Sequence, residues 1–193
     1  MQSHYFTDDP NLPDDPRTFI YYYKEHALRL QSNSGVFSHG HVDEATDVLL
    51  GHIPPLEASL LDLGCGYGVI GVALGRAYGL RVTMADVNPR ALACAEINCR
   101  ENGVKAEIVQ SDCFEGVTGS FDTITLNPPI HAGKEIVYRM FEGAKEHLLP
   151  GGGFYVVMLD KHGAASASAH LRGIFGACET LYRKKGLRVL RCE

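Results

Sequence analysis

The chain has 193 residues, of which 45% are hydrophobic and 21% charged, as in an ordinary globular protein. No apolar run approaches the roughly 20 residues that a membrane-spanning helix needs, and the N-terminus lacks the features of a signal peptide, so we expect a cytoplasmic protein without a membrane partner. The formal net charge of −5 disfavours a protein that grips folded RNA with its whole surface. Action on nucleic acid would need a local basic patch, a ribonucleoprotein surface or a second chain.

The length favours a single domain over residues 1–193. We expect three parts within it. A Pro- and Asp-rich flexible arm covers residues 1–16, a hairpin and a helix follow over 17–58, and a core covers 59–193.

The N-terminal part carries the pattern of a β-hairpin. Residues 18–24 are β-branched and aromatic, and residues 27–31 alternate apolar and polar side chains. The run Tyr21-Tyr22-Tyr23 is interpreted as hairpin packing, with outward rings for base stacking as the alternative. An amphipathic helix is predicted over 42–50.

Strand and helix patterns alternate from Ser59 onward, which predicts a Rossmann-like, doubly wound α/β fold with a mostly parallel sheet. The last two strand-like runs are joined too tightly for a crossover, so they must be antiparallel. We therefore expect a seven-stranded sheet with an antiparallel C-terminal strand, plus the N-terminal hairpin. The expected strands are 59–63, 80–86, 105–110, 121–126, 153–159, 177–183 and 186–192, and the expected helices are 69–78, 89–102, 134–148 and 165–175.

The cysteines show neither a CxxC pair nor the spacing of metal ligands, so they are interpreted as buried or incidental thiols in a reducing compartment. His39 and His41 have no evident third ligand, and no metal is expected. The cysteines are Cys65, Cys94, Cys99, Cys113, Cys178 and Cys192.

A buried strand that ends at Asp62 and Leu63 leads into a turn with glycine at alternate positions, Gly64, Gly66 and Gly68. Glycine permits tight turns and lets a ligand approach the backbone, so this βα unit is typical of a nucleotide-like cofactor site. The run from Gly66 to Gly71 also satisfies the dinucleotide pattern G-x-G-x-x-G, so the turn alone leaves the cofactor open.

Acidic residues follow the next two predicted strands. Asp86 could accept both hydroxyls of a ribose, which suits NAD and S-adenosylmethionine equally. Asp112 could accept a hydrogen bond from an adenine amino group, or it could cap a turn.

The fourth core strand leads directly into Asn127-Pro128-Pro129-Ile130. Two prolines remove two backbone donors and stiffen the loop. The Asn127 side chain and the Pro128 carbonyl can then both accept hydrogen bonds from a planar NH2 group, as on guanine, adenine or a glutamine amide. A dehydrogenase has no need of such a loop, so it favours a methyl donor; a rigid turn without chemistry is the alternative.

Three segments together resemble class I S-adenosylmethionine-dependent methyltransferases of the methyltransferase small domain group, whose best-known members are ribosomal-RNA guanine-N2 methyltransferases of the RsmC type. They are Asp62–Gly68, Asp86–Asn88 and Asn127–Lys134, and the segment Ser34–Ser38, followed by Val42-Asp43, resembles one that precedes the core in that group. The resemblance covers roughly residues 18–193.

The resemblance implies a role for each matched position. The glycines would admit the methionine part of the cofactor with Asp62 near its ammonium, Asp86 would bind the ribose, and Asp112 the adenine. The implied cofactor-binding residues are Phe37, Asp62, Gly64, Cys65, Gly66, Gly68, Asp86, Val87, Asp112, Cys113 and Asn127, and the implied catalytic residues are Asn127, Pro128, Pro129 and Ile130.

The chain departs from the group at Ile130, where many relatives carry an aromatic residue that stacks on the target base. RsmC-type enzymes also carry an additional N-terminal domain of similar size, so their exact rRNA target is not carried over. Candidate substrate contacts are His131, Lys134 and the pair Lys184-Lys185. The two lysines belong to a basic cluster that is either an RNA-backbone patch or a solvated hairpin tip.

The loop residues thus predict direct, metal-free methyl transfer from S-adenosylmethionine to an exocyclic amine. The resemblance implies guanine N2 of 16S ribosomal RNA as the expected acceptor and RNA or a ribosomal subunit as the partner. One alternative keeps the fold but methylates a protein amide or a small-molecule amine. The others are a non-catalytic cofactor-binding module and an NAD oxidoreductase.

Overall fold

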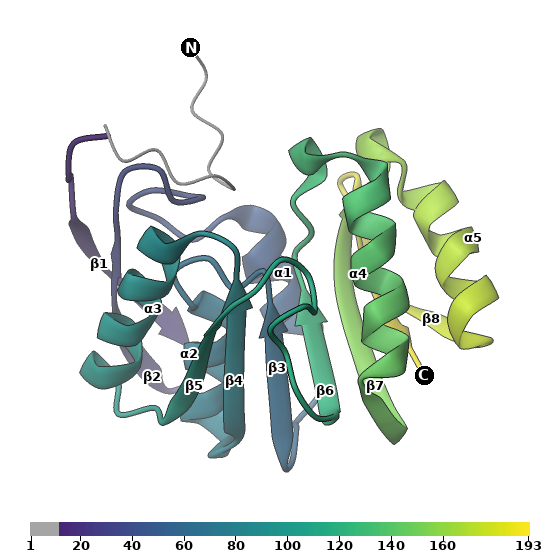
Figure 1. Ribbon diagram of the computed structural model, residues 1–193, viewed down its shortest axis with the longest axis horizontal. Helices are drawn as coiled ribbons and strands as arrows, with labels where there is room; N and C mark the ends of the chain where they lie inside the picture. Colours follow the sequence, from purple (N-terminus) through teal and green to yellow (C-terminus); the bar gives the residue numbers. More distant parts are fainter. Residues whose placement is uncertain (1–11) are drawn as a thin grey trace.

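The computed structural model describes residues 12–193, apart from the side chain of His162. Its main sheet has seven strands in the order β5-β4-β3-β6-β7-β9-β8, and β9 runs antiparallel to both of its neighbours. Figure 1 shows the parallel part, from β5 to β7. This confirms the predicted Rossmann-like sheet. The strands are β3 (Ser59–Leu63), β4 (Arg81–Asp86), β5 (Ala106–Gln110), β6 (Phe121–Leu126), β7 (Leu148–Leu159), β8 (Cys178–Lys184) and β9 (Leu187–Cys192).

Helices cover both faces of the sheet and create two hydrophobic clusters. The first three helices pack with the N-terminal hairpin on one face, and the last two pack on the other. The helices are α1 (Glu44–His52), α2 (Val69–Tyr78), α3 (Pro89–Glu101), α4 (Lys134–Glu146) and α5 (Ala164–Phe175), with 3-10 turns η1 (Ile130–Ala132) and η2 (Asp160–His162). Because both faces of the sheet are covered, every residue of the central strand β3 is buried.

The predicted hairpin forms as β1 (Arg17–Tyr23) and β2 (His26–Ser32), paired only with each other. Asn98 of α3 anchors it, because its side chain accepts from the Gln31 N–H at 2.7 Å and donates to the Gln31 carbonyl at 2.8 Å. Of the tyrosine run, Tyr23 is buried and Tyr21 donates to Asp47, whereas Tyr22 is 75% exposed. Hairpin packing therefore accounts for two of the three rings.

Part of the expected flexible arm is held in place. The Arg90 guanidinium, near the start of α3, lies 2.9 Å from Asp14 and donates to the Leu12 carbonyl at 3.1 Å, and Ser34 donates to the Pro13 carbonyl. Residues 12–16 thus differ from the expectation because α3 and the 33–35 loop offer them partners; residues 1–11 lie outside the described residues.

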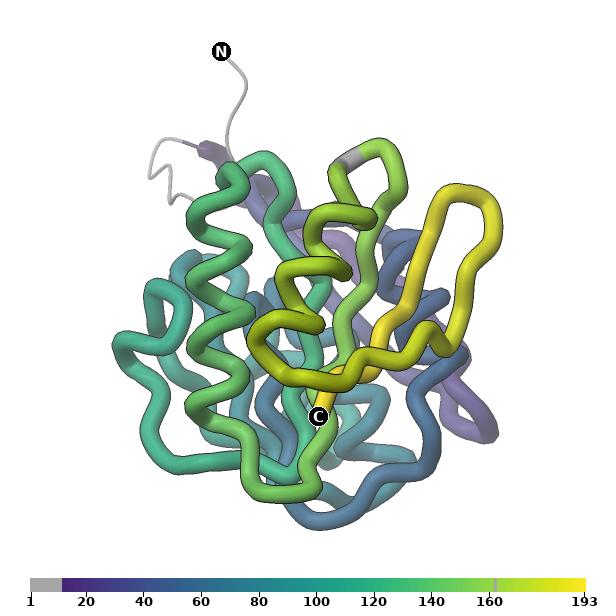
Figure 2. Tube along the Cα trace, turned by 90° about the vertical axis from the view of Figure 1, so that its right-hand side faces the viewer, coloured from purple at the N-terminus to yellow at the C-terminus, as the bar shows by residue number. Residues whose placement is uncertain are grey.

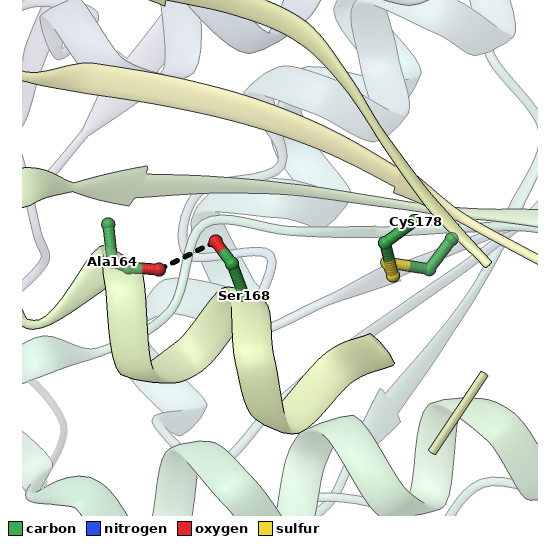
Figure 3. Close-up of a disulfide and its surroundings, with 4 residues drawn as sticks. Ala164, Ser168 and Cys178 are labelled. Atoms are coloured by element: carbon green, nitrogen blue, oxygen red, sulfur yellow. Dashed lines mark hydrogen bonds between the residues drawn. A yellow bond between two sulfur atoms is a disulfide. The ribbon is translucent and has the colours of Figure 1, made fainter. Parts of the chain in front are cut away.

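The expectation for the cysteines was wrong for one pair. Cys178 and Cys192 face each other across the antiparallel β8–β9 ladder and form a disulfide next to α5 (Figure 3). The other four cysteines are free and buried, as predicted. Cysteine spacing carried no signal for the pair, because strand register brought the two residues together.

Candidate active site

A cavity of about 410 Å³ opens at the carboxyl ends of β3, β4, β5 and β6. Ligands of open α/β sheets bind at this edge, where the strand order reverses, and the volume falls within the usual range for small-molecule sites. The cavity is lined by Val36, Phe37, Ser38, Asp43, Thr46, Leu63, Gly64, Cys65, Gly66, Tyr67, Val69, Ile70, Ala85, Asp86, Val87, Ala91, Ser111, Asp112, Cys113, Asn127, Pro128, Pro129, Ala132, Ile136 and Met140.

Strand register explains why distant segments meet there. Leu63 pairs with Ala85 on one side and with Leu126 on the other. The next residues along the three strands therefore lie at the same level of the sheet: Gly64 and Asn127 are the first residues after β3 and β6, and Asp86 is the last residue of β4. The glycine turn, an acid and the Asn-Pro-Pro loop come together by this alignment.

The glycine turn presents bare backbone to the cavity. Gly66 has φ +54, and a Cβ added there would meet no atom within 4 Å, so the missing side chain leaves open space. Gly68 serves a different purpose, because it does not line the cavity and its added Cβ would lie 3.1 Å from the Ala95 Cβ. Gly68 is thus needed where the start of α2 packs against α3 and β4, and it lies outside the cavity lining.

Asp62 turns into the core and does not line the cavity. Its carboxylate accepts from the Gly71 N–H at 2.9 Å and from the Thr125 hydroxyl at 3.2 Å. Burial raises the pKa of Asp62 to about 7, against the opposing effect of these two hydrogen bonds. Asp62 therefore fixes the start of α2 to β6, which differs from its expected place beside a ligand ammonium.

Asp86 lines the cavity and also braces the glycine turn. It accepts from the Gly66 N–H at 2.8 Å and from the Asn88 N–H at 2.9 Å. Burial raises the pKa of Asp86, while backbone N–H groups lower it. A carboxylate oxygen can accept more than one hydrogen bond, so the group can still receive the hydroxyls of a ribose.

Asp112 and Cys113 line the part of the cavity that lies beyond β5. Arg139 of α4 reaches both, at 2.5 Å from the Asp112 carboxylate and 3.2 Å from the Cys113 sulfur. Phe37 and Val87, both more than a third exposed, add apolar wall. Apolar side chains and an acid in one cavity lining suit a flat heteroaromatic ring.

The Asn-Pro-Pro loop forms the other wall. Asn127 donates from Nδ2 to the Asp43 carboxylate at 2.8 Å and to the Thr46 hydroxyl at 3.0 Å. Both hydrogens of the amide are thereby used, and its Oδ1 accepts no hydrogen bond from residues 12–193. Asn127 lines the cavity, and its amide oxygen is the atom of the group that is left available to a donor.

The predicted residues that follow the loop do not all reach the cavity. Ile130, His131 and Lys134 are absent from its lining, although Pro129 and Ala132 belong to it. The Lys134 ammonium lies over the Tyr138 ring, 4.9 Å from the centroid.

The basic cluster lies outside the cavity. Lys184 and Lys185 occupy the tip of the β8–β9 hairpin, which reaches the same end of the molecule as the loops after β6 and β7 (Figure 2). Of the neighbouring cations, Arg188 pairs with Asp160 at 2.7 Å and Arg191 with Glu193 at 2.6 Å. Within residues 12–193, the cations of this hairpin that form no ion pair are Arg183, Lys184 and Lys185, at or next to the tip.

The sequence interpretation missed several cavity residues, chiefly Asp43 and Thr46 at the start of α1 and Ile136 and Met140 on α4. The sequence could have indicated Asp43 as the N-cap residue of α1, but nothing in the sequence indicates that Asp43 contacts Asn127. Within residues 12–193 no three His, Cys, Asp or Glu side chains are grouped as metal ligands, and no described helix is long and apolar enough to cross a membrane.

Comparison with known proteins gives the family. The sequence matches the methyltransferase small domain over residues 27–191. It is 35% identical to the uncharacterized protein YbxB of Bacillus subtilis, over 100% of this chain and 99% of that protein. It is 41% identical to ribosomal RNA small subunit methyltransferase C of Pasteurella multocida, over 70% of this chain and 46% of that enzyme.

A solved structure agrees. The fold resembles that of the T. thermophilus 16S rRNA N2 G1207 methyltransferase RsmC, a complex with AdoMet and guanosine, with a TM-score of 0.85 and 29% identity. The match covers 97% of this chain and 53% of that one, so the chain spans about half the length of the RsmC relatives it matches. The chain therefore belongs to the methyltransferase small domain family of S-adenosylmethionine-dependent transferases.

Proposed function

We propose that this enzyme methylates an exocyclic amino group, guanine N2 of small-subunit ribosomal RNA. The observation that carries the proposal is the orientation of Asn127, a residue of the cavity lining, whose amide hydrogens are both bound by Asp43 and Thr46 so that its oxygen remains as an acceptor. An acceptor next to the buried Pro128 suits the two hydrogens of a planar NH2 group.

The residues of the cavity fit the cofactor. The glycine turn at Gly64 and Gly66 would accommodate its methionine part, Asp86 would accept hydrogen bonds from its ribose hydroxyls, and the region of Asp112 and Cys113 would hold its adenine. Phe37, Cys65 and Val87 contribute wall contacts. When bound, S-adenosylmethionine supplies an electrophilic methyl group.

The residues of the chain contribute by positioning the acceptor amine. Asn127 Oδ1 and the Pro128 carbonyl accept the two hydrogens of the acceptor amine, which fixes the direction of the nitrogen lone pair. Pro129 stiffens the loop, and Ile130 borders it outside the cavity lining. We further propose that the parts described form one catalytic domain, because the two hydrophobic clusters share one sheet.

The RNA assignment is supported by relatives named as rRNA methyltransferases and by the lysines at the β8–β9 tip. His131 and Lys134 precede or begin α4, beside the loop, and are proposed as rim contacts for the RNA. One observation favours the alternative acceptor, a protein amide or a small amine: neither Lys184 nor Lys185 lines the cavity.

Methyl transfer from labelled S-adenosylmethionine tests the proposal. The acceptors are small ribosomal subunits and total RNA from a strain that lacks the protein, followed by nuclease digestion and nucleoside analysis. We expect label in N2-methylguanosine from 16S rRNA. Label in ribosomal protein, in a different nucleoside or only in small amines would overturn the assignment.

A further inference from the structure

Two residues at the start of α1 hold the Asn127 amide, and the role proposed for the Asn-Pro-Pro loop does not yet include them. We propose that Asp43 and Thr46 are positioning residues for methyl transfer, which set the orientation of Asn127 and polarise its carbonyl. The inference rests on the proposed role of Asn127.

Hydrogen-bond directions fix the orientation. The Thr46 hydroxyl donates its one hydrogen to the Asp43 carboxylate at 3.0 Å, so its oxygen can only accept from Asn127. A flipped Asn127 would set its own oxygen against a carboxylate oxygen and a hydroxyl oxygen, with no hydrogen between them. The observed orientation, with Oδ1 as the acceptor that is left over, is therefore strongly favoured.

Asp43 is itself held in place as the N-cap of α1. Its oxygens accept from the Ala45 N–H at 3.1 Å and from the Thr46 N–H at 3.0 Å, and its backbone is extended, with φ −70 and ψ 147. Thr46 is buried, so water competes little for its hydroxyl group. A helix end thus serves as a rigid support for a loop residue that lies 84 positions away in the sequence.

The charge of Asp43 adds an electrostatic effect. A carboxylate that accepts from an amide N–H draws positive charge toward the nitrogen and makes the amide oxygen a stronger acceptor. As the amine attacks the methyl carbon, the N–C bond forms while the S–C bond breaks, and the nitrogen becomes positively charged until it releases a proton to water. An oxygen already fixed beside the nitrogen stabilises that charge. The effect is greater in the transition state than in the bound amine, so it should change kcat more than KM.

The central test is Asp43→Asn, with Asp47→Asn as the matched control. Asparagine caps helices as well as aspartate does, so α1 is retained, but an NH2 group or a single oxygen then faces Asn127. Asp47 lies in the first turn of the same helix and accepts from Tyr21 at 2.8 Å. With unmodified 16S rRNA transcript as the acceptor, we expect kcat to fall about 10- to 100-fold in D43N and less than about 2-fold in D47N, with unchanged Kd for S-adenosylmethionine.

Thr46 gives a second, smaller signal. Thr46→Val removes the acceptor and should lower kcat about 3- to 10-fold, whereas Thr46→Ser keeps the hydroxyl and should restore nearly full activity. Equal losses in both variants would point to packing and contradict a positioning role.

A double-mutant cycle separates this inference from the proposed function. If Asp43 acts through Asn127, D43N should have little further effect on kcat in an N127A background. Multiplied losses would overturn the inference and leave the role of Asn127 intact. A fully active N127A enzyme would overturn both.

A spectroscopic measurement makes the inference testable without any acceptor. The side-chain NH2 signals of Asn127, identified by their loss in N127A, should shift in D43N and T46V and stay in place in D47N. Unchanged Asn127 signals in D43N, in the full chain with S-adenosylmethionine bound, would refute the contact.

Discussion

On both sides of the cavity a carboxylate accepts hydrogen bonds from N–H groups, but the donors differ. On the wall formed by the glycine turn, Asp86 accepts the backbone N–H of Gly66, and in the core behind this wall Asp62 accepts the backbone N–H of Gly71. On the wall formed by Asn127, Asp43 accepts a side-chain N–H. The contacts at the glycine turn join residues that are close in sequence, and they shape a ligand site. The contact at Asn127 joins remote segments, and it orients one amide oxygen. Changes on the first wall should therefore affect cofactor binding and stability, and changes on the second should affect turnover.

The largest expected effect is on the Asn127 wall. Asn127→Ala removes the oriented acceptor, and we expect kcat to fall about 100- to 1,000-fold, in line with the loss of one preorganised hydrogen-bonding group at a reacting centre. Kd for S-adenosylmethionine, measured by calorimetry, should stay within about 2-fold. An equal loss of affinity and turnover would show that the two walls are not separate.

The opposite pattern is expected on the glycine wall. Asp86→Ala removes the acceptor proposed for the ribose and leaves the Gly66 N–H unpaired, so Kd for S-adenosylmethionine should rise about 10- to 100-fold. Glu107→Ala, on the exposed side of β5, removes the same charge away from the cavity and should leave Kd unchanged. A kcat effect at saturating cofactor that exceeds the Kd effect would contradict the division.

Asp62 offers a pH test of the core that supports this wall. Its folded-state pKa of about 7 lies above the ordinary value of 3.8, so the folded state binds more protons between these values. Stability should therefore decrease as pH rises from about 4 to 7. Asp62→Asn mimics the protonated group, and the pH dependence of its Tm should be flatter by several degrees over this range. Parallel Tm curves for the two proteins would show that Asp62 does not titrate there.

The smallest effect is expected outside both walls. Lys184→Ala combined with Lys185→Ala removes charge at the hairpin tip, so KM for rRNA should rise about 3-fold at low salt while kcat stays constant. The difference should vanish at high salt, because the contribution is electrostatic. A salt-independent effect would assign these lysines to something other than phosphate contact.

Local sequence patterns were sufficient to predict the sheet and the two main loops of the cavity. Alternating strand and helix signals predicted the sheet, because each element buries its own apolar face, and tight connections required the antiparallel end. The glycines after Leu63 and the prolines after Asn127 marked the two loops of the cavity, since unusual backbone needs show in residue type.

Only the tertiary structure decided how these parts are joined. Asp62 lies on a strand buried on both faces, so alternation could not tell which way it points, and its core position came from its register with Thr125 of β6. The Asp43–Asn127 contact and the Cys178–Cys192 disulfide likewise depend on helix docking and strand register. Such contacts are set by packing between elements, and the type of a residue does not indicate which distant residue it will contact.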